Sequence, residues 1–170
     1  MSFSNKSSSN RQTNENMLIN CSDMGNNAIV MAGSSGSILV SRDNGLTWHL
    51  KTSGTSNDLN SIVFGNNTFI AVGSSGTILV SRDIGQTWHS KTAGTSNDLN
   101  SIIFGNDIFI AVGASGTILI SRDNGLTWHS KTSGTSKNLT GIVLANDNFV
   151  VYGSSITIIS TNIGRTWHST

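Results

Sequence analysis

The sequence predicts an all-β protein of four antiparallel sheets, each with four short strands, and three observations lead to this prediction. First, one octapeptide recurs along the chain, at Ser41–Trp48, Ser81–Trp88, Ser121–Trp128 and, in altered form, Ser160–Trp167. Second, the first three copies are forty residues apart and the last is thirty-nine, a spacing typical of arrays of supersecondary units. Third, each repeat consists of short apolar runs between turn residues, and no segment shows the 3.6-residue period of a helix.

The second repeat, residues 57–96, shows the order of strands and turns expected in one sheet. The predicted strands are Leu59–Phe64, Phe69–Val72, Thr77–Val80 and a more polar Thr87–Thr92, with breaks at Gly65–Asn67, Ser74–Gly76 and Asp83–Gly85. The middle strands are apolar at successive positions, which indicates a sheet covered on both faces. Stacked blades of a β-propeller have this burial, whereas the coils of a β-solenoid, the alternative, are usually shorter and their strands parallel. We therefore expect a β-propeller with blades at about residues 17–56, 57–96, 97–136 and 137–170.

The recurring octapeptide contains a turn whose residue types each have a structural reason. Its aspartate is placed to accept hydrogen bonds from backbone N–H groups of the turn. Glycine follows two residues later, where a hairpin turn requires a positive φ. A tryptophan ends each copy and is expected to fold over the turn, burying a large apolar area in each blade. The predicted structural positions are Asp43, Gly45, Trp48, Asp83, Gly85, Trp88, Asp123, Gly125, Trp128, Gly164 and Trp167.

This pattern, Ser-x-Asp-x-Gly-x-Thr-Trp, resembles the Asp-box, or BNR repeat, and is intact in three copies. The rest of the blade, from Leu59 to Asp83, is similar to bacterial Asp-box propeller repeats, which occur in sialidases and in the photosystem II assembly factor family. The resemblance covers residues 17–170 and implies a β-propeller. In that family the Asp-box is a structural turn away from the catalytic centre, so the resemblance implies little about function.

The terminal repeats depart from the pattern. Ser22 and Asp23 stand where the second repeat has Ile62 and Val63, so we expect the first strand to be degenerate or shifted. In the last repeat one residue is missing before Ser160, and an asparagine replaces the aspartate of the turn. End repeats commonly diverge because they meet something different. Three arrangements stay open: a four-bladed ring closed by one chain, a larger ring completed by a second chain as a homodimer, and a part of something larger.

Composition excludes several partners. The net charge of +1 gives no basic stripe for nucleic acid, and no apolar run reaches the ~20 residues that a membrane-spanning helix needs. Cys21 is the only cysteine and the N-terminus lacks the apolar region of a signal peptide, so a soluble protein is expected. A reducing compartment such as the cytoplasm is the simplest interpretation, and a secreted protein with its signal removed is the alternative. Residues 1–16 are polar and patternless, which predicts a flexible tail.

Repeated basic residues flank the turn and are the candidate ligand-binding groups. The arginine candidates are Arg42, Arg82 and Arg122, and the histidine candidates are His49, His89, His129 and His168. Each histidine follows the tryptophan and therefore points to the opposite face of the sheet. The histidines lie on the outermost strand, so they cannot converge on a metal at the propeller axis. We expect no metal site and no cofactor.

The residues argue against catalysis. A sialidase needs a tyrosine nucleophile paired with a glutamate, yet the only tyrosine is Tyr152 and the only glutamate is Glu15, in the tail. A paired-carboxylate glycoside hydrolase, the least favoured alternative, would need two free aspartates in one pocket, and most are committed to turns. The sequence thus predicts a non-enzymatic binding module for a protein or a glycan. A multivalent lectin with equivalent sites between blades, and a recently amplified or engineered propeller without a tuned ligand, remain as alternatives.

Overall fold

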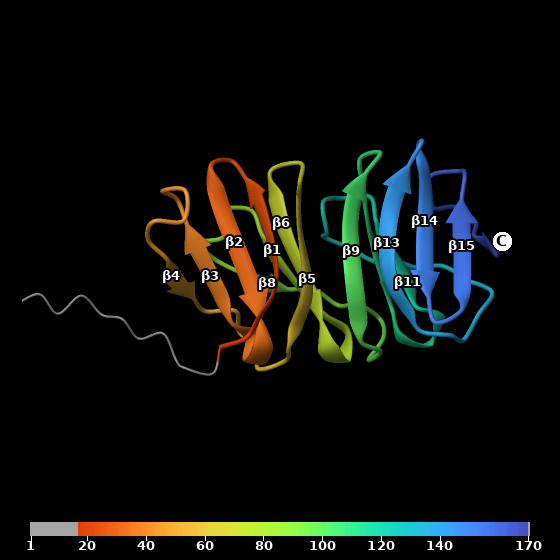
Figure 1. Ribbon diagram of the computed structural model, residues 1–170, viewed down its shortest axis with the longest axis horizontal. Coiled ribbons are helices and arrows are strands. Elements are labelled where there is room, and N and C mark those ends of the chain that lie inside the picture. The colour runs from red at the N-terminus through yellow and green to blue at the C-terminus, as the bar shows by residue number, and fades with distance from the viewer. Residues whose placement is uncertain (1–16, 170) are drawn as a thin grey trace, which may run out of the picture.

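A computed structural model describes residues 17–169, and in this part of the chain sixteen strands form four antiparallel sheets of four strands each. Each sheet takes four strands in chain order, so each is one blade (Figure 1). The strands of blades 1 and 2 are β1 Ile19–Gly25, β2 Ala28–Gly33, β3 Ile38–Ser41, β4 His49–Lys51, β5 Leu59–Gly65, β6 Thr68–Gly73, β7 Thr77–Ser81 and β8 His89–Ser90. Those of blades 3 and 4 are β9 Leu99–Gly105, β10 Ile108–Gly113, β11 Ile118–Ser121, β12 His129–Ser130, β13 Leu139–Ala145, β14 Asn148–Gly153, β15 Ile156–Ser160 and β16 His168–Ser169. The predicted all-β propeller architecture is confirmed.

The blades pack one on the next in chain order. The first strands of consecutive blades are neighbours, β1 beside β5, β5 beside β9 and β9 beside β13. Three hydrophobic clusters of eleven buried residues each fill the junctions between blades 1 and 2, 2 and 3, and 3 and 4. Figure 1 shows blade 1 and blade 4 at opposite ends of the molecule's long axis. Residues 17–169 therefore form an open row of blades, and the ring closed by one chain is not the arrangement observed.

Each junction is also tied by hydrogen bonds that recur with the repeat. The side-chain amide of Asn20 donates to the carbonyl of Leu59 at 3.0 Å, and that of Asn60 donates to the carbonyl of Leu99 at 2.9 Å. Asn100 makes the same bond to the next blade at 2.8 Å. These bonds satisfy polar groups inside the stack, where a missing partner would be costly.

The first strand of blade 1 was expected to be degenerate or shifted. It keeps the register of the repeat, because Ser22 pairs with Met31 as Ile62 pairs with Ala71 one repeat later, and it is more exposed than β5. One predicted detail of the strands is wrong. The fourth strand of blade 2 is shorter than predicted, since only His89–Ser90 pairs with β7. Three short 3₁₀ turns, Ser34–Gly36, Ser74–Gly76 and Ala114–Gly116, occupy the predicted breaks between the second and third strands.

The tail predicted at residues 1–16 lies outside the described residues. Within residues 17–169, no helix has the length and apolar character needed to cross a membrane.

Candidate functional site

In blades 1 to 3 the aspartate of the octapeptide organises its own turn. Asp83 accepts hydrogen bonds from the backbone N–H of Thr87 at 2.9 Å, from the Thr87 hydroxyl at 2.6 Å and from the Ser81 hydroxyl at 2.8 Å. The Ser81 hydroxyl oxygen in turn accepts from the N–H of Gly85 at 2.9 Å. Asp43 and Asp123 hold their turns with the same pattern of bonds. The turn thereby gains a closed set of hydrogen bonds around one carboxylate.

These bonds also set the acidity of the carboxylates. Hydrogen bonds from Thr47, and then from Ser41, lower the pKa of Asp43 from 3.8 to about 2. At Asp83, partial desolvation alone would raise the pKa, but the bonds from Thr87, Ser81 and the Gln86 N–H outweigh it and lower the pKa to about 2. A carboxylate held ionised in this way cannot serve as a general acid near neutral pH.

Blade 4 makes the same turn without the charge. Asn162 accepts from the Ser160 hydroxyl at 3.0 Å and from the Thr166 N–H at 2.9 Å, and its amide donates to the Thr166 hydroxyl at 2.7 Å. The geometry of the turn therefore depends on an oxygen acceptor at this position and not on a negative charge.

The tryptophans cover the turns, and three of the four also pack between blades. Trp88 is 8% exposed and belongs to the cluster between blades 1 and 2, while its indole N–H donates to the Gly85 carbonyl at 3.2 Å. Trp128 and Trp167 are buried at the next two junctions. Trp48 belongs to the first blade that the structure describes and is only half-buried. The three buried rings present no open aromatic face to a sugar.

The candidate arginines connect neighbouring blades. Arg82 donates from Nη2 to the carbonyl of Asn124 at 2.9 Å, and Arg122 makes the corresponding bond to Ile163 at 2.8 Å. Arg42 donates to the carbonyls of Asp83 and Ile84 at 3.2 and 3.3 Å. Each guanidinium uses one nitrogen in these bonds and remains exposed, so it retains N–H groups for a ligand.

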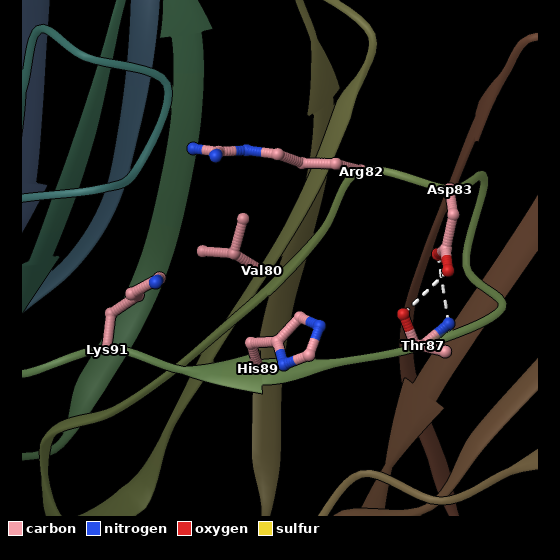
Figure 2. Close-up of a pocket in the computed structure, with 6 residues that line it drawn as sticks. All are labelled: Val80, Arg82, Asp83, Thr87, His89 and Lys91. Carbon is pink, nitrogen blue, oxygen red and sulfur yellow. Dashed lines mark hydrogen bonds between the residues drawn. The ribbon is translucent and has the colours of Figure 1, made fainter.

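One of these arginines lines a pocket of about 320 Å³ on the side of blade 2 that faces blade 3. Val80, Arg82, Asp83, Thr87, His89 and Lys91 line this pocket (Figure 2). Val80 and His89 are paired across β7 and β8 and therefore share one sheet face. In Figure 2, the charged ends of Arg82 and Lys91 lie at one end of the pocket, whereas Asp83 and Thr87 bond to each other at the other end. We name the set Arg82, His89 and Lys91 the basic groove of blade 2.

The basic groove presents three nitrogen-bearing side chains and one carboxylate, and that carboxylate is occupied by its own turn. His89 and Lys91 have no side-chain hydrogen bond or ion pair to any residue between 17 and 169. Such an arrangement is suited to an anionic group, because the positive charges of Arg82 and Lys91 outnumber the one carboxylate and their N–H groups can donate to a ligand. Lys91 was not among the residues predicted from the sequence, although a lysine two residues after the histidine recurs in the first three repeats.

The same residues recur beside the other junctions, with differences. Blade 1 has Arg42, His49 and Lys51, but here the lysine ammonium donates to the Gln86 side chain of blade 2 at 2.9 Å. Blade 3 has Arg122, His129 and Lys131. In blade 4, His168 is exposed on β16 and a threonine replaces the arginine. The four histidines thus lie on four separate outer strands.

No metal site is formed by the described residues. Between residues 17 and 169 no three of the histidine, cysteine, aspartate and glutamate side chains come together in a way that could hold an ion. The Cys21 thiol is half-buried beside the Ala32 carbonyl, and burial raises its pKa to about 12.

Comparison with known sequences agrees with the turn geometry. The BNR/Asp-box repeat family matches residues 39–50 and 119–130, which are the recurring turns of blades 1 and 3. The chain carries Asp-box repeats. No curated protein matches the chain at a significant level.

Solved structures with the same fold have diverse descriptions. YCF48 bound to D1 peptide superposes with a TM-score of 0.72 at 19% identity, over 90% of this chain and 55% of that one. An ancestral GH74 enzyme gives 0.70 at 19% identity, over 88% of this chain and 23% of that one. The computationally designed Ika4 protein gives 0.66 at 16% identity, over 93% of both chains. The Asp-box chain spans little more than half of the YCF48 structure, and at these identities the likeness shows the fold alone.

Proposed function

We propose that this Asp-box propeller is a non-enzymatic binding module that binds an acidic segment of a partner protein in its basic grooves. The observation that carries the proposal is the basic groove of blade 2, a pocket of about 320 Å³ with Arg82, His89 and Lys91 along its wall. A carboxylate entering the groove would accept charge-assisted hydrogen bonds from these donors.

The proposal favours a binding role over catalysis because the carboxylate beside the groove is already used. Asp83 is held ionised by its turn, with a pKa of about 2, and no second acid lines the pocket. Hydrolysis by paired carboxylates needs one acid of raised pKa. A peptide ligand is favoured over a glycan because Trp88 and Trp128 are buried, and YCF48, a structure of the same fold, is described as bound to a peptide.

Several similar grooves would act together on one acidic segment. The arginine, histidine and lysine recur in blades 1 to 3, so an extended ligand could contact more than one groove and gain affinity without new kinds of contact. Because the contacts are largely electrostatic, binding should weaken as salt concentration rises.

The test is binding of a fluorescein-labelled oligoglutamate peptide, followed by anisotropy at low and at physiological salt. Lys91→Glu should weaken binding by about fivefold at low salt, which corresponds to ~1 kcal/mol for one exposed ion pair together with the added repulsion. Lys137→Glu is the matched control, because it makes the same charge change at a lysine outside the grooves that donates to the Ser155 carbonyl. Absence of binding to the unmodified chain, or an equal loss in both variants, would overturn the proposal.

A further inference from the structure

Every blade inside the row has two different apolar faces, and both are buried. In blade 2, Phe69, Leu79 and Trp88 lie in the cluster shared with blade 1. Ile70 and Val80 lie in the cluster shared with blade 3. We call these the leading face and the trailing face. Each junction in the chain joins the trailing face of one blade to the leading face of the next.

The leading face of blade 1 has no blade to cover it within residues 17–169. Leu39 occupies the same register position in blade 1 as Leu79 in blade 2. Leu79 is 1% exposed, whereas Leu39 is only half-buried. Met24 is 69% exposed and Leu50 is 59% exposed. The position of Leu50 is informative because the other three blades have serine there, at Ser90, Ser130 and Ser169. A face that met only water would not gain from replacing a serine with a leucine.

The trailing face of blade 4 is uncovered in the same way. Val150 and Ile159 are half-buried, whereas their counterparts in blade 2, Ile70 and Val80, are 0% and 2% exposed. Tyr152, at 47% exposure, stands where blade 2 has a fully buried valine.

The surroundings of Tyr152 show that blade 4 has adapted to this larger side chain. A Cβ placed on Gly141 would collide with the Tyr152 ring, so the ring lies directly over the glycine. The corresponding position in blade 2 is Ser61. An exposed tyrosine on an apolar face is a common anchor of protein interfaces, since it offers a large rigid surface and a hydroxyl.

We infer that a second copy of this chain covers both faces, the trailing face of blade 4 of each copy packing on the leading face of blade 1 of the other. The contact continues the junction already made three times inside the chain, with the same two kinds of apolar face. Two copies related by a two-fold axis would form two such contacts, closing a ring and leaving no face free. This inference is independent of the proposed peptide binding.

The junction between copies would lack the polar ties of the internal junctions. The asparagine that donates to the next blade is replaced by Thr140, and the arginine by Thr161. Thr140 instead donates to the Tyr152 carbonyl at 3.3 Å within its own blade. The association therefore rests on apolar contact, so the copies should separate on dilution while each chain stays folded.

The first test is light scattering of the 170-residue chain over a range of concentrations. We expect a mass twice the 18.0 kDa of one chain at high concentration, falling to a single chain on dilution. Leu50→Glu should shift the dissociation constant upward at least tenfold. Leu126→Glu is the matched control, an exposed leucine of blade 3 away from both terminal faces, and it should leave the dissociation constant unchanged. Circular dichroism checks that each variant remains folded.

A mixing experiment tests the head-to-tail geometry. Leu50→Glu damages only the leading face of blade 1, and Tyr152→Lys damages only the trailing face of blade 4. A mixture of the two variants places both changes in one junction and leaves the other intact, so it should associate more tightly than either variant alone. A single chain at all concentrations, a continuing series of larger masses, or no recovery on mixing would each overturn the two-copy ring.

Discussion

Replacing Trp88 with alanine tests whether the packing between blades stabilises the fold. The indole is 8% exposed and lies in the cluster between blades 1 and 2, where it contributes both to the cover of its own turn and to the junction. A tryptophan side chain has an area of ~200 Å², of which about nine-tenths is covered here. At ~25 cal/mol per Å², the lost burial amounts to about 4.5 kcal/mol. Measured costs of such truncations, about 3–5 kcal/mol, agree with this value.

The assay is urea unfolding followed by circular dichroism, with Trp48→Ala as the matched control. Trp48 donates to its own glycine carbonyl at 3.1 Å, as Trp88 does at 3.2 Å, but within residues 17–169 no blade precedes that of Trp48. At a protein concentration where light scattering shows a single chain, Trp48→Ala should therefore cost less, about 2 kcal/mol. A loss below about 1 kcal/mol for Trp88→Ala, or equal losses for the two variants, would refute the reasoning.

Two further substitutions probe the turns. In urea unfolding at neutral pH, Asp83→Asn should lower the free energy of unfolding less than Asp83→Ala does. Asn162 shows that an amide can make the same bonds in this turn. The pKa of Asp83 falls from 3.8 to about 2 on folding, so the ionised carboxylate stabilises the protein above pH 3.8 and this contribution is lost as the pH falls towards 2. Asp83→Asn should therefore reduce the fall in the free energy of unfolding between about pH 4 and about pH 2, and an unchanged fall would contradict the assignment. Gly116→Ala should lower the free energy of unfolding by about 3 kcal/mol or more, because φ is +70° and the new Cβ would meet the Thr135 carbonyl. Gly134→Ala should lower it by about 1 kcal/mol, because φ is +77° but the space around the new Cβ is open. Thermal unfolding of both glycine variants compares them, and equal shifts in Tm would show that the collision is relieved elsewhere.

The fold was predictable because its signals are local and repeated. One blade is defined by the turn at Asp83 and Gly85 and by the apolar runs on either side of it. The recurrence of this pattern about every forty residues gives the number of blades. Strand ends were less predictable. Thr87 was expected to begin the fourth strand, but its N–H and hydroxyl bond to Asp83 and hold it in the turn.

The candidate site was predicted only in part. Arg82 and His89 were identified from their repetition. The sequence did not show that Arg82 donates a hydrogen bond to the Asn124 carbonyl, because that contact joins residues 42 apart in two different blades. Lys91 was missed although its lysine also recurs, at Lys51 and Lys131, because the sequence did not show that its side chain shares a pocket with Arg82. Whether the four blades close into a ring could not be predicted from the repeat either, because closure depends on the angle between blades.

The two proposed surfaces differ in chemistry, and this difference makes them separable. The proposed peptide-binding surface is made of basic side chains that recur in the first three repeats, so its binding should weaken with salt. The terminal faces are single and apolar, with Leu50 at one end and Tyr152 at the other, so association through them should persist or strengthen in a salting-out salt such as sulfate. Titrating sodium sulfate would therefore move peptide affinity and self-association in opposite directions. If both weakened together, charge would also hold the copies together, and the apolar junction inferred from the repeat would be wrong.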